Sequence, residues 1–270
     1  MKTVLVTGAT DGIGLETARQ LLAAGMHLLV HGRNEAKAVR QAKALASRVS
    51  GGKTTPVWGD LSRMREVASL AEQVRAIAPV LNVLINNAGI YVQRRAITED
   101  GFEMTMAVNH FATYLLTRLV GPLVSKAPAG RIVTVSSMAH QSGDIDLDDL
   151  TFANGFDAYS AYATSKLANI LFTRALATRL AGNNVTANCL HPGVIDTKLL
   201  HAGFSIKGAS VEKGARTSVY LATSDKVIGV NGKYFADCRE TAPSSQARDD
   251  SLAEALWLIS ERLLTSFLQS

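Results

Sequence analysis

Two side chains with complementary acid–base chemistry, Tyr162 and Lys166, are separated by one turn of a predicted helix. The apolar residues Leu167, Ile170 and Leu171 follow at helical spacing, and residues four apart lie on one face of a helix. A tyrosine normally titrates near pH ~10, and a neighbouring cation favours the phenolate and lowers its pKa. Such a pair can donate a proton to a carbonyl oxygen or accept one from an alcohol. Because the spacing also fits an ordinary exposed helix pair, the rest of the chain must decide between the two.

The composition describes a chain that can fill one large apolar core. It has 270 residues, 47% of them hydrophobic, and a net charge of +5. The basic residues are thinly spread, and the densest group, from Lys37 to Lys53, has the spacing of a solvated helix face. Without zinc-finger spacing or a basic run interleaved with aromatics, we expect no nucleic-acid partner. Cys189 and Cys238 lie outside any Cys-x-x-Cys pattern, which favours two buried thiols and predicts no metal site.

The sequence has no signal-peptide pattern, and none of its apolar runs approaches the ~20 residues of a membrane span. The first residues lead directly into an apolar strand. We therefore expect a protein of the reducing cytoplasm, without a membrane anchor.

The first strand, turn and helix predict a site for a phosphate. Residues 3–6 are apolar and largely β-branched, like a strand that is buried in a parallel sheet. The segment from Thr7 to Gly14 follows with the spacing Gly-x-x-x-Gly-x-Gly, and a helical pattern continues beyond it. In such a turn, backbone N–H groups and the helix dipole face an anion, and glycines remove the Cβ atoms that would obstruct it.

Residues after the second and third predicted strands indicate how the nucleoside of a dinucleotide would be held. The segment from His31 to Asn34 contains Arg33 but no acid. In dinucleotide-binding folds an acid at this point holds the ribose 2′-hydroxyl, whereas an arginine accommodates a 2′-phosphate. Asp60 follows the third strand, where it either contacts an adenine edge or caps a helix that starts at Ser62.

Amide and hydroxyl side chains follow the fourth and fifth predicted strands. Asn86 to Gly89 come directly after residues 83–85, at the edge where open α/β sheets bind ligands. Asn109 lies within an apolar helix, where an amide needs hydrogen-bond partners, so it is either functional or a satisfied structural group. Ser137 follows the strand at residues 131–135 and is either a donor to a bound oxygen or part of a simple turn.

The rest of the chain continues the alternation of strands and helices. A sixth strand at residues 185–190 leads into a glycine-punctuated segment at about 194–214, which we expect to be a mobile substrate flap. A short last strand at 232–235 and an amphipathic helix at about 250–268 close the chain. Because no linker or repeat interrupts this order, we predict one Rossmann-type α/β domain over residues 1–270, a doubly wound parallel sheet with helices on both faces.

Taken in order, these motifs resemble those of the short-chain dehydrogenase/reductase family over essentially the whole chain. They are the glycine turn, Asn86 to Gly89, Asn109, Ser137, Tyr162 with Lys166, and Pro192 and Gly193 with Thr197. The wide gap between Ser137 and Tyr162, with the segments 165–172, 191–194 and 232–238, is similar to the retinol-dehydrogenase-like branch. Members of that branch often begin with a membrane anchor, so the absence expected here argues against a membrane-borne substrate.

The resemblance implies a catalytic set and a cofactor. Tyr162 would be the acid/base, and Lys166 would lower its pKa and bind the nicotinamide ribose. Ser137 would hold the substrate oxygen, and Asn109 would position a water for proton relay. Thr197 would hold the carboxamide of the nicotinamide, whose C4 exchanges a hydride with the substrate carbon. The other implied cofactor contacts are Gly8, Thr10, Asp11, Gly12, Ile13, Gly14, Arg33, Asn34, Asp60, Leu61, Asn87, Ala88, Gly89, Pro192, Gly193 and Val194.

We therefore expect an enzyme that acts on a carbonyl/alcohol pair of a small molecule, with a medium-sized lipophilic aldehyde or ketone favoured by the mixed apolar flap. NADP(H) is the favoured cofactor and NAD(H) the alternative. Asp11 would repel a 2′-phosphate that it faced, but we expect it to make local turn or capping bonds instead. An NADP(H)-sensing regulator without turnover is the alternative function, although a sensor has no need for the four catalytic residues. An epimerase or dehydratase usually carries a larger substrate domain, and the oligomeric state is left open.

Overall fold

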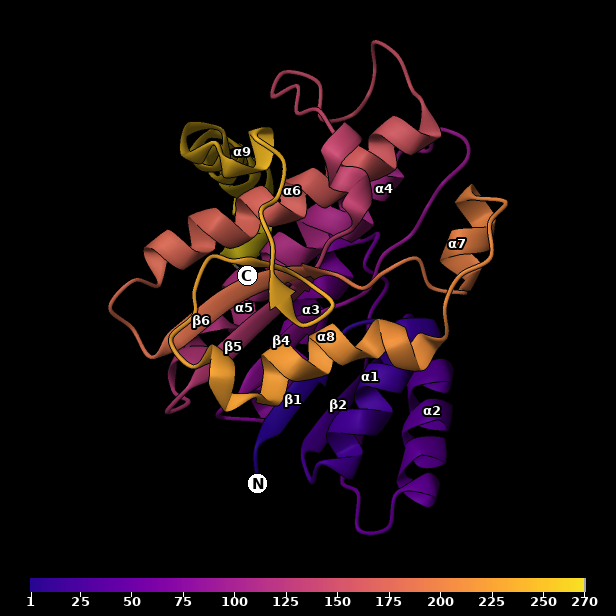
Figure 1. Ribbon diagram of the computed structural model, residues 1–270, viewed down its shortest axis with the longest axis vertical. Coiled ribbons are helices and arrows are strands. Elements are labelled where there is room, and N and C mark those ends of the chain that lie inside the picture. The colour runs from indigo at the N-terminus through magenta and orange to yellow at the C-terminus, as the bar shows by residue number, and fades with distance from the viewer. Residues whose placement is uncertain (270) are drawn as a thin grey trace.

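Eight strands form one sheet in the order β3-β2-β1-β4-β5-β6-β7-β8 in the computed structural model, which describes residues 1–269 (Figure 1). Neighbouring strands are parallel except for the last pair, which is antiparallel. The strand order reverses between β1 and β4, the kind of switch point beside which open sheets bind ligands. The strands are β1 Thr3–Val6, β2 His27–Gly32, β3 Thr54–Trp58, β4 Val83–Asn86, β5 Gly130–Val135, β6 Val185–His191, β7 Tyr234–Ala236 and β8 Arg239–Glu240.

Helices cover both faces of the sheet and enclose two apolar layers (Figure 1). On β1, Val4 and Val6 pack into one layer, while Leu5 packs into the other. Since side chains alternate across a strand, a strand covered on both faces needs consecutive apolar residues, as residues 3–6 have. One face carries α1 Gly12–Ala23, α2 Glu35–Arg48 and α8 Val211–Thr223; the other carries α3 Met64–Ile77, α5 Ala112–Ser125, α6 Ala158–Arg179 and α9 Asp250–Leu268.

The helix α6 is the long central element of the second face. Asp157 caps its N-terminus by accepting a hydrogen bond from the Ser160 N–H at 2.7 Å. Every residue from Ala161 to Thr173 is buried, because the sheet, α9 and the segment after β5 surround this stretch. The pair Tyr162 and Lys166 is therefore not an exposed helix pair.

Two helices differ from their sequence-based predictions. The helix expected at Ser62 begins at Met64, and Asp60 accepts a hydrogen bond from the Ser62 N–H at 2.9 Å in a turn before it. The helix that contains Asn109 is interrupted by a π-helical turn, and Asn109 lies within this turn. This region consists of α4 Met104–Met106, η1 Ala107–Phe111 and the continuous α5.

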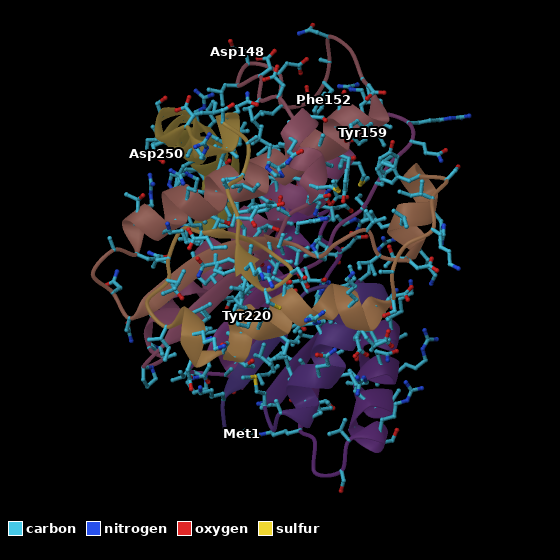
Figure 2. All side chains as sticks on the ribbon, viewed as in Figure 1. Met1, Asp148, Phe152, Tyr159, Tyr220 and Asp250 are labelled. Carbon is cyan, nitrogen blue, oxygen red and sulfur yellow. The ribbon has the colours of Figure 1, made fainter. Side chains whose placement is uncertain are left out.

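The predicted flap contains a short helix, α7 Lys198–Gly203, and its base is pinned by a bridge between Ile195 and Ala209. The last predicted strand continues into a tight turn and β8, which makes Cys238 only half-buried, unlike Cys189. The connection after β5 projects at the top of the molecule in Figure 2, with Asp148 and Phe152 labelled on it. The remaining short elements are η2 Met138–Ser142, η3 Asp225–Val227 and η4 Gln246–Arg248.

Candidate active site

The carboxyl edge of the sheet opens into a cleft of about 740 Å³. Tyr162 and Lys166 reach it from α6, and the ammonium of Lys166 lies 5.6 Å from the centroid of the Tyr162 ring. The same ammonium donates a hydrogen bond to the Val135 carbonyl at 3.2 Å, which fixes it at the end of β5. The helical spacing read from the sequence thus places both groups on the floor of one cleft.

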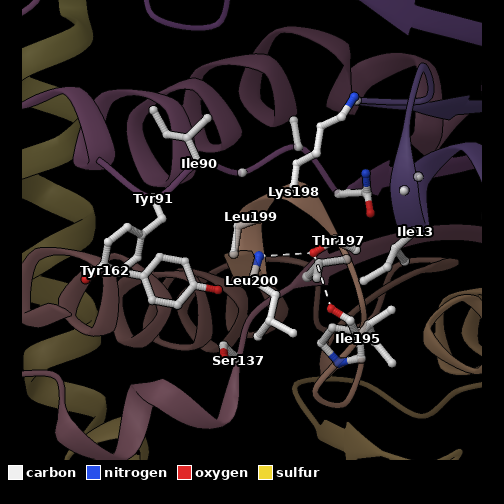
Figure 3. Close-up of a pocket in the computed structure, with 18 of the residues that line it drawn as sticks. Ile13, Ile90, Tyr91, Ser137, Tyr162, Ile195, Thr197, Lys198, Leu199 and Leu200 are labelled. Atoms are coloured by element: carbon white, nitrogen blue, oxygen red, sulfur yellow. Dashed lines mark hydrogen bonds between the residues drawn. The ribbon is translucent and has the colours of Figure 1, made fainter. Parts of the chain in front are cut away.

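Ser137 enters the cleft from the segment directly after β5. Its side chain accepts a hydrogen bond from the Ala139 N–H at 3.2 Å and caps the short helix η2. The same hydroxyl interacts with Tyr162, whose phenolate it favours. Figure 3 shows Ser137, Tyr162 and Tyr91 around one space in the cleft. Ser137 therefore serves the turn and also faces the reactive phenol.

Burial is the largest influence on both titrating groups. It raises the pKa of Tyr162 to about 12, and the Ser137 hydroxyl acts in the opposite direction. It lowers the pKa of Lys166 to about 8, because an ammonium is poorly solvated there. The phenol is therefore protonated at neutral pH in the protein alone, and the lowering of its pKa by Lys166 remains a prediction.

Asn109 lies behind the cleft rather than in its lining, and its side chain is fully buried. Its Oδ1 accepts a hydrogen bond from the Ile90 N–H at 2.8 Å, and its Nδ2 donates to the Ile90 carbonyl at 3.1 Å and to Ser165 Oγ at 2.9 Å. Gly89 separates it from the cleft: a Cβ there would lie 3.2 Å from Lys166 Nζ and 3.4 Å from Asn109 Oδ1. These bonds give Asn109 a structural role, and its role in a proton relay remains a prediction.

The glycine turn after β1 is built for close approach of the backbone. Gly8 and Gly12 adopt positive φ angles of 66° and 53°, which favour glycine. A Cβ on Gly14 would lie 2.3 Å from both the Gly8 carbonyl oxygen and Asn87 Nδ2, so the start of α1 packs directly on the turn. Asp11 caps α1 by accepting from the Gly12 N–H at 2.9 Å, the local role expected for it.

Two residues that the sequence did not single out hold this turn in place. The Thr7 hydroxyl accepts hydrogen bonds from the Asn87 and Ala88 N–H groups at 2.9 and 3.0 Å, which ties the turn to the end of β4. His31 accepts from the Gly8 N–H at 3.0 Å through Nδ1, so its Nε2–H donates to the Gly59 carbonyl. Burial lowers the pKa of His31 to about 4, which keeps the ring neutral. A polar residue at the end of a buried strand was the only sequence signal for His31.

Positive side chains collect where the second strand meets the cleft. Arg33 lines the cleft, its side chain is 64% exposed, and its Nε lies 4.0 Å from Asp60 Oδ2. Lys37 also lines the cleft from the first turn of α2, a role that the interpretation as a solvated face missed. Asn34 does not line it; its Oδ1 accepts from the Lys37 N–H at 3.0 Å and caps α2, so capping chemistry decides its position.

The segment after β6 lies opposite the glycine turn. Thr197 caps α7 by accepting from the Leu200 N–H at 3.2 Å, and its hydroxyl donates to the Ile195 carbonyl at 3.3 Å (Figure 3). A Cβ on Gly12 would lie 3.4 Å from Thr197 Cγ2, so the two walls of the cleft nearly meet there. The other predicted residues of the turns also line the cleft: Thr10, Ile13, Leu61, Asn87, Ala88, Gly89, Pro192, Gly193 and Val194.

Aromatic and aliphatic side chains that the sequence did not identify surround Tyr162. The ring of Tyr91 lies 5.6 Å from those of both Tyr162 and Phe204, measured between centroids, and Tyr159 lies 6.0 Å from Phe204. Gly203 is required beside them, because a Cβ there would lie 2.9 Å from the Tyr91 ring. These residues come from the segment after β4, from α6 and from the flap, and no local pattern links them.

These features fit a dinucleotide. The glycine turn presents the N-terminus of a 12-residue helix to the cleft, with no Cβ in the way. Arg33 and Lys37 line the cleft beside the end of β2, where the nucleoside would rest, and Lys166 lines it beside the end of β5, on the other side of the switch point between β1 and β4. Within residues 1–269, no three His, Cys, Asp or Glu side chains gather as metal ligands. None of the helices over the same residues has the length and apolarity needed to cross a membrane.

Comparison with known proteins gives the family. The family model for short chain dehydrogenases matches residues 2–205. Human retinol dehydrogenase 14 is 41% identical over 286 residues, which cover 96% of this chain and 85% of that protein. Mouse polyprenol dehydrogenase is 37% identical over 279 residues, with 97% and 83% covered. The chain belongs to the short-chain dehydrogenase/reductase family, is similar to its retinol-dehydrogenase-like branch, and is an oxidoreductase of a fold that binds NAD(P).

Solved structures agree with this assignment. An uncharacterized protein from Mycobacterium paratuberculosis has a TM-score of 0.83 at 34% identity, covering 98% of this chain and 94% of that chain. A protein described as an NAD(P)-dependent gluconate 5-dehydrogenase from Beutenbergia cavernae has a TM-score of 0.72 at 30% identity, covering 87% and 94%. That second structure contains NADP at low occupancy. The predicted doubly wound fold is confirmed.

Proposed function

We propose that the protein is an NADP(H)-dependent oxidoreductase that interconverts an uncharged lipophilic aldehyde or ketone and its alcohol. The observation that carries this proposal is the meeting of Tyr162, Ser137 and Lys166 at one end of a cleft whose other end holds the glycine turn and Arg33. Hydride transfer is the chemistry that a bound nicotinamide supplies.

Tyr162, Ser137 and Lys166 have different roles in the reaction at the substrate oxygen. During reduction the Tyr162 hydroxyl donates its proton to that oxygen, and the Ser137 hydroxyl donates a hydrogen bond that holds it in place. Lys166 keeps its positive charge at neutral pH, since its pKa is lowered only to about 8. This charge stabilises the phenolate that Tyr162 becomes, and so offsets the rise in its pKa caused by burial. In oxidation of an alcohol the same groups act in reverse.

The preference for NADP(H) rests on charge. Arg33 and Lys37 line the nucleoside end of the cleft, and the guanidinium of Arg33 suits a phosphate. Asp60 lies 4.0 Å from Arg33 Nε, within range of a weak ion pair that a 2′-phosphate would replace with a stronger contact. Asp11 is engaged as a helix cap and in an ion pair with Lys198, which limits its repulsion of a phosphate.

The nature of the substrate follows from what lines the cleft around Tyr162. The aromatic rings there belong to Tyr91, Tyr159 and Phe204. Leu199 and neighbouring aliphatic side chains line the same part of the cleft. Apart from Lys166, the charged residues of the lining lie at the dinucleotide end: Asp11, Arg33, Lys37, Asp60 and Lys198. A substrate carboxylate or phosphate would therefore be buried with no counter-ion except Lys166, whose charge already serves the Tyr162 phenolate, and such burial is costly.

The test is oxidation of NADPH and of NADH by the purified protein with two matched sets of substrates. One set contains uncharged aldehydes and ketones of increasing chain length, and the other contains keto acids of the same lengths. We expect turnover with NADPH on the uncharged set. Equal turnover of the keto acids would exclude the proposed substrate class, and tight NADPH binding without turnover on either set would favour a regulatory protein.

A further inference from the structure

One ion pair joins the flap to the glycine turn, and the proposed reaction does not use it. The ammonium of Lys198, in the first turn of α7, pairs with the carboxylate of Asp11, 187 positions away in the sequence. Both residues line the cleft. Figure 3 shows the Lys198 side chain extending from the flap toward the glycine turn. Thr197 approaches Gly12 at the same point, where a Cβ on Gly12 would lie 3.4 Å from Thr197 Cγ2, so the flap lies close against the turn here.

Stability of the fold does not explain this pair. The side chains of Lys198 and Asp11 are 89% and 60% exposed, and ion pairs in water contribute little to folding. The position of the pair is more informative. Asp11 caps the N-terminus of α1, and the positive end of this helix faces the cleft where a diphosphate would bind.

Where the flap meets the glycine turn, neighbouring charges alternate in sign. Lys198 is the largest influence that lowers the pKa of Asp11, and Lys37 adds to it, so the carboxylate is ionised. A diphosphate on the glycine turn would be repelled by that carboxylate. If the Lys198 ammonium lay between the Asp11 carboxylate and the diphosphate, it would be attracted to both. It would then hold the flap more firmly when the diphosphate is present.

We propose that Lys198 is a dinucleotide-binding residue carried by the flap, whose ammonium bridges Asp11 and the cofactor diphosphate and so couples cofactor binding to flap closure. The inference rests on the proposed function, because it requires a dinucleotide at the glycine turn. It differs from the role of Arg33, since NADPH and NADH share the diphosphate and only NADPH has the 2′-phosphate.

Binding of NADPH and NADH to three variants tests the bridge. Lys198→Ala removes one charge-assisted hydrogen bond and should weaken both cofactors about tenfold. Asp11→Asn keeps a capping side chain but removes the repulsive charge, so it should leave affinity unchanged or increase it. Lys207→Ala is the matched control, because Lys207 is an exposed flap lysine outside the cleft lining. Affinity in Lys198→Ala equal to that of wild type, or equal weakening in Lys198→Ala and Asp11→Asn, would overturn the proposal.

Amide exchange over residues 198–208 gives a readout that does not depend on turnover. Without ligand, Lys198→Ala and Asp11→Asn should both exchange faster than wild type, because each breaks the pair. Saturating NADPH should slow exchange in wild type and Asp11→Asn but not in Lys198→Ala. Equal slowing in Lys198→Ala would refute the coupling. If wild type binds neither cofactor, the proposed function itself fails, and the ligand-free exchange rates still show whether the pair holds the flap.

Discussion

The ammonium of Lys166 lies 5.6 Å from the ring centroid of Tyr162, and both side chains are buried in the same helix. Tyr162→Phe keeps the packing of that ring and removes only its proton carrier. We expect cofactor binding to persist and turnover to fall by at least ~100-fold, the usual scale of acid–base catalysis. Fluorescence titration with NADPH and steady-state kinetics measure the two quantities, and near-normal turnover would exclude Tyr162 as the acid/base.

Lys166→Ala removes a charge that serves both the phenol and the nicotinamide ribose in the proposed mechanism. We expect turnover to fall and the dissociation constant for NADPH to rise in the same variant. An alanine also removes the hydrogen bond to the Val135 carbonyl, so thermal unfolding is measured alongside. Lost turnover with unchanged NADPH affinity would rule out the ribose contact.

Arg33→Ala tests whether Arg33 determines the selectivity for NADPH over NADH. Hydrogen bonds to charged groups contribute about 1.5–3 kcal/mol, so losing Arg33 should reduce NADPH selectivity about ten- to a hundredfold. The Michaelis constant for NADPH should rise, while that for NADH stays nearly unchanged. A wild-type preference for NADH, or equal weakening of both cofactors, would contradict the assignment of NADP(H).

Gly14→Ala tests the close packing of the glycine turn. The new Cβ would lie 2.3 Å from the Gly8 carbonyl oxygen, and backbone cannot easily move away. We expect a loss of about 1–3 kcal/mol in the free energy of unfolding, typical of overpacking, with weaker dinucleotide binding. Ala23→Gly is the control: Ala23 is the exposed last residue of the same helix, so this change should cost no more than about 0.5–1 kcal/mol, the value for the middle of a helix, and leave binding intact. Unfolding in urea and NADPH titration measure both.

Because His31 and His110 are buried in their neutral form, we expect the protein to lose stability in acid. Burial lowers the pKa of His31 and of His110 to about 4, below the value of ~6.5 in an unfolded chain. The unfolded state therefore binds more protons between pH ~6.5 and ~4, and stability falls as pH falls through this window, by up to about 1.4 kcal/mol per pH unit for each group. Urea midpoints at pH 7 and pH 5 check the sign. His31→Gln should reduce the slope, and an unchanged midpoint at pH 5 would contradict the prediction.

The sequence alone predicted the elements whose signals are local. Helical spacing placed Tyr162 and Lys166 on one face of a helix, and the alternation of strands and helices predicted the doubly wound sheet that the structure has. Capping was harder to predict, because a side chain that suits a cap also suits a turn. Asp60 makes a turn with Ser62 before the helix begins at Met64, and Asn34 caps α2 instead of lining the cleft. The predicted strand ends identified Ser137 and Asn87 to Gly89 as residues of the cleft, since parallel strands bring their carboxyl ends to one edge of the sheet.

Contacts between distant segments were decided only by the tertiary structure. The sequence gives no spacing that links Lys198 to Asp11, Phe204 to Tyr91, or His31 to Gly8, because the order of the strands in the sheet determines which loops meet. Burial likewise arises from packing, and it raises the pKa of Tyr162 where an adjacent cation predicts a decrease. A local pattern fixes hydrogen bonds and helix faces over a few residues, whereas the shape, polarity and solvation of the cleft depend on elements that the fold brings together.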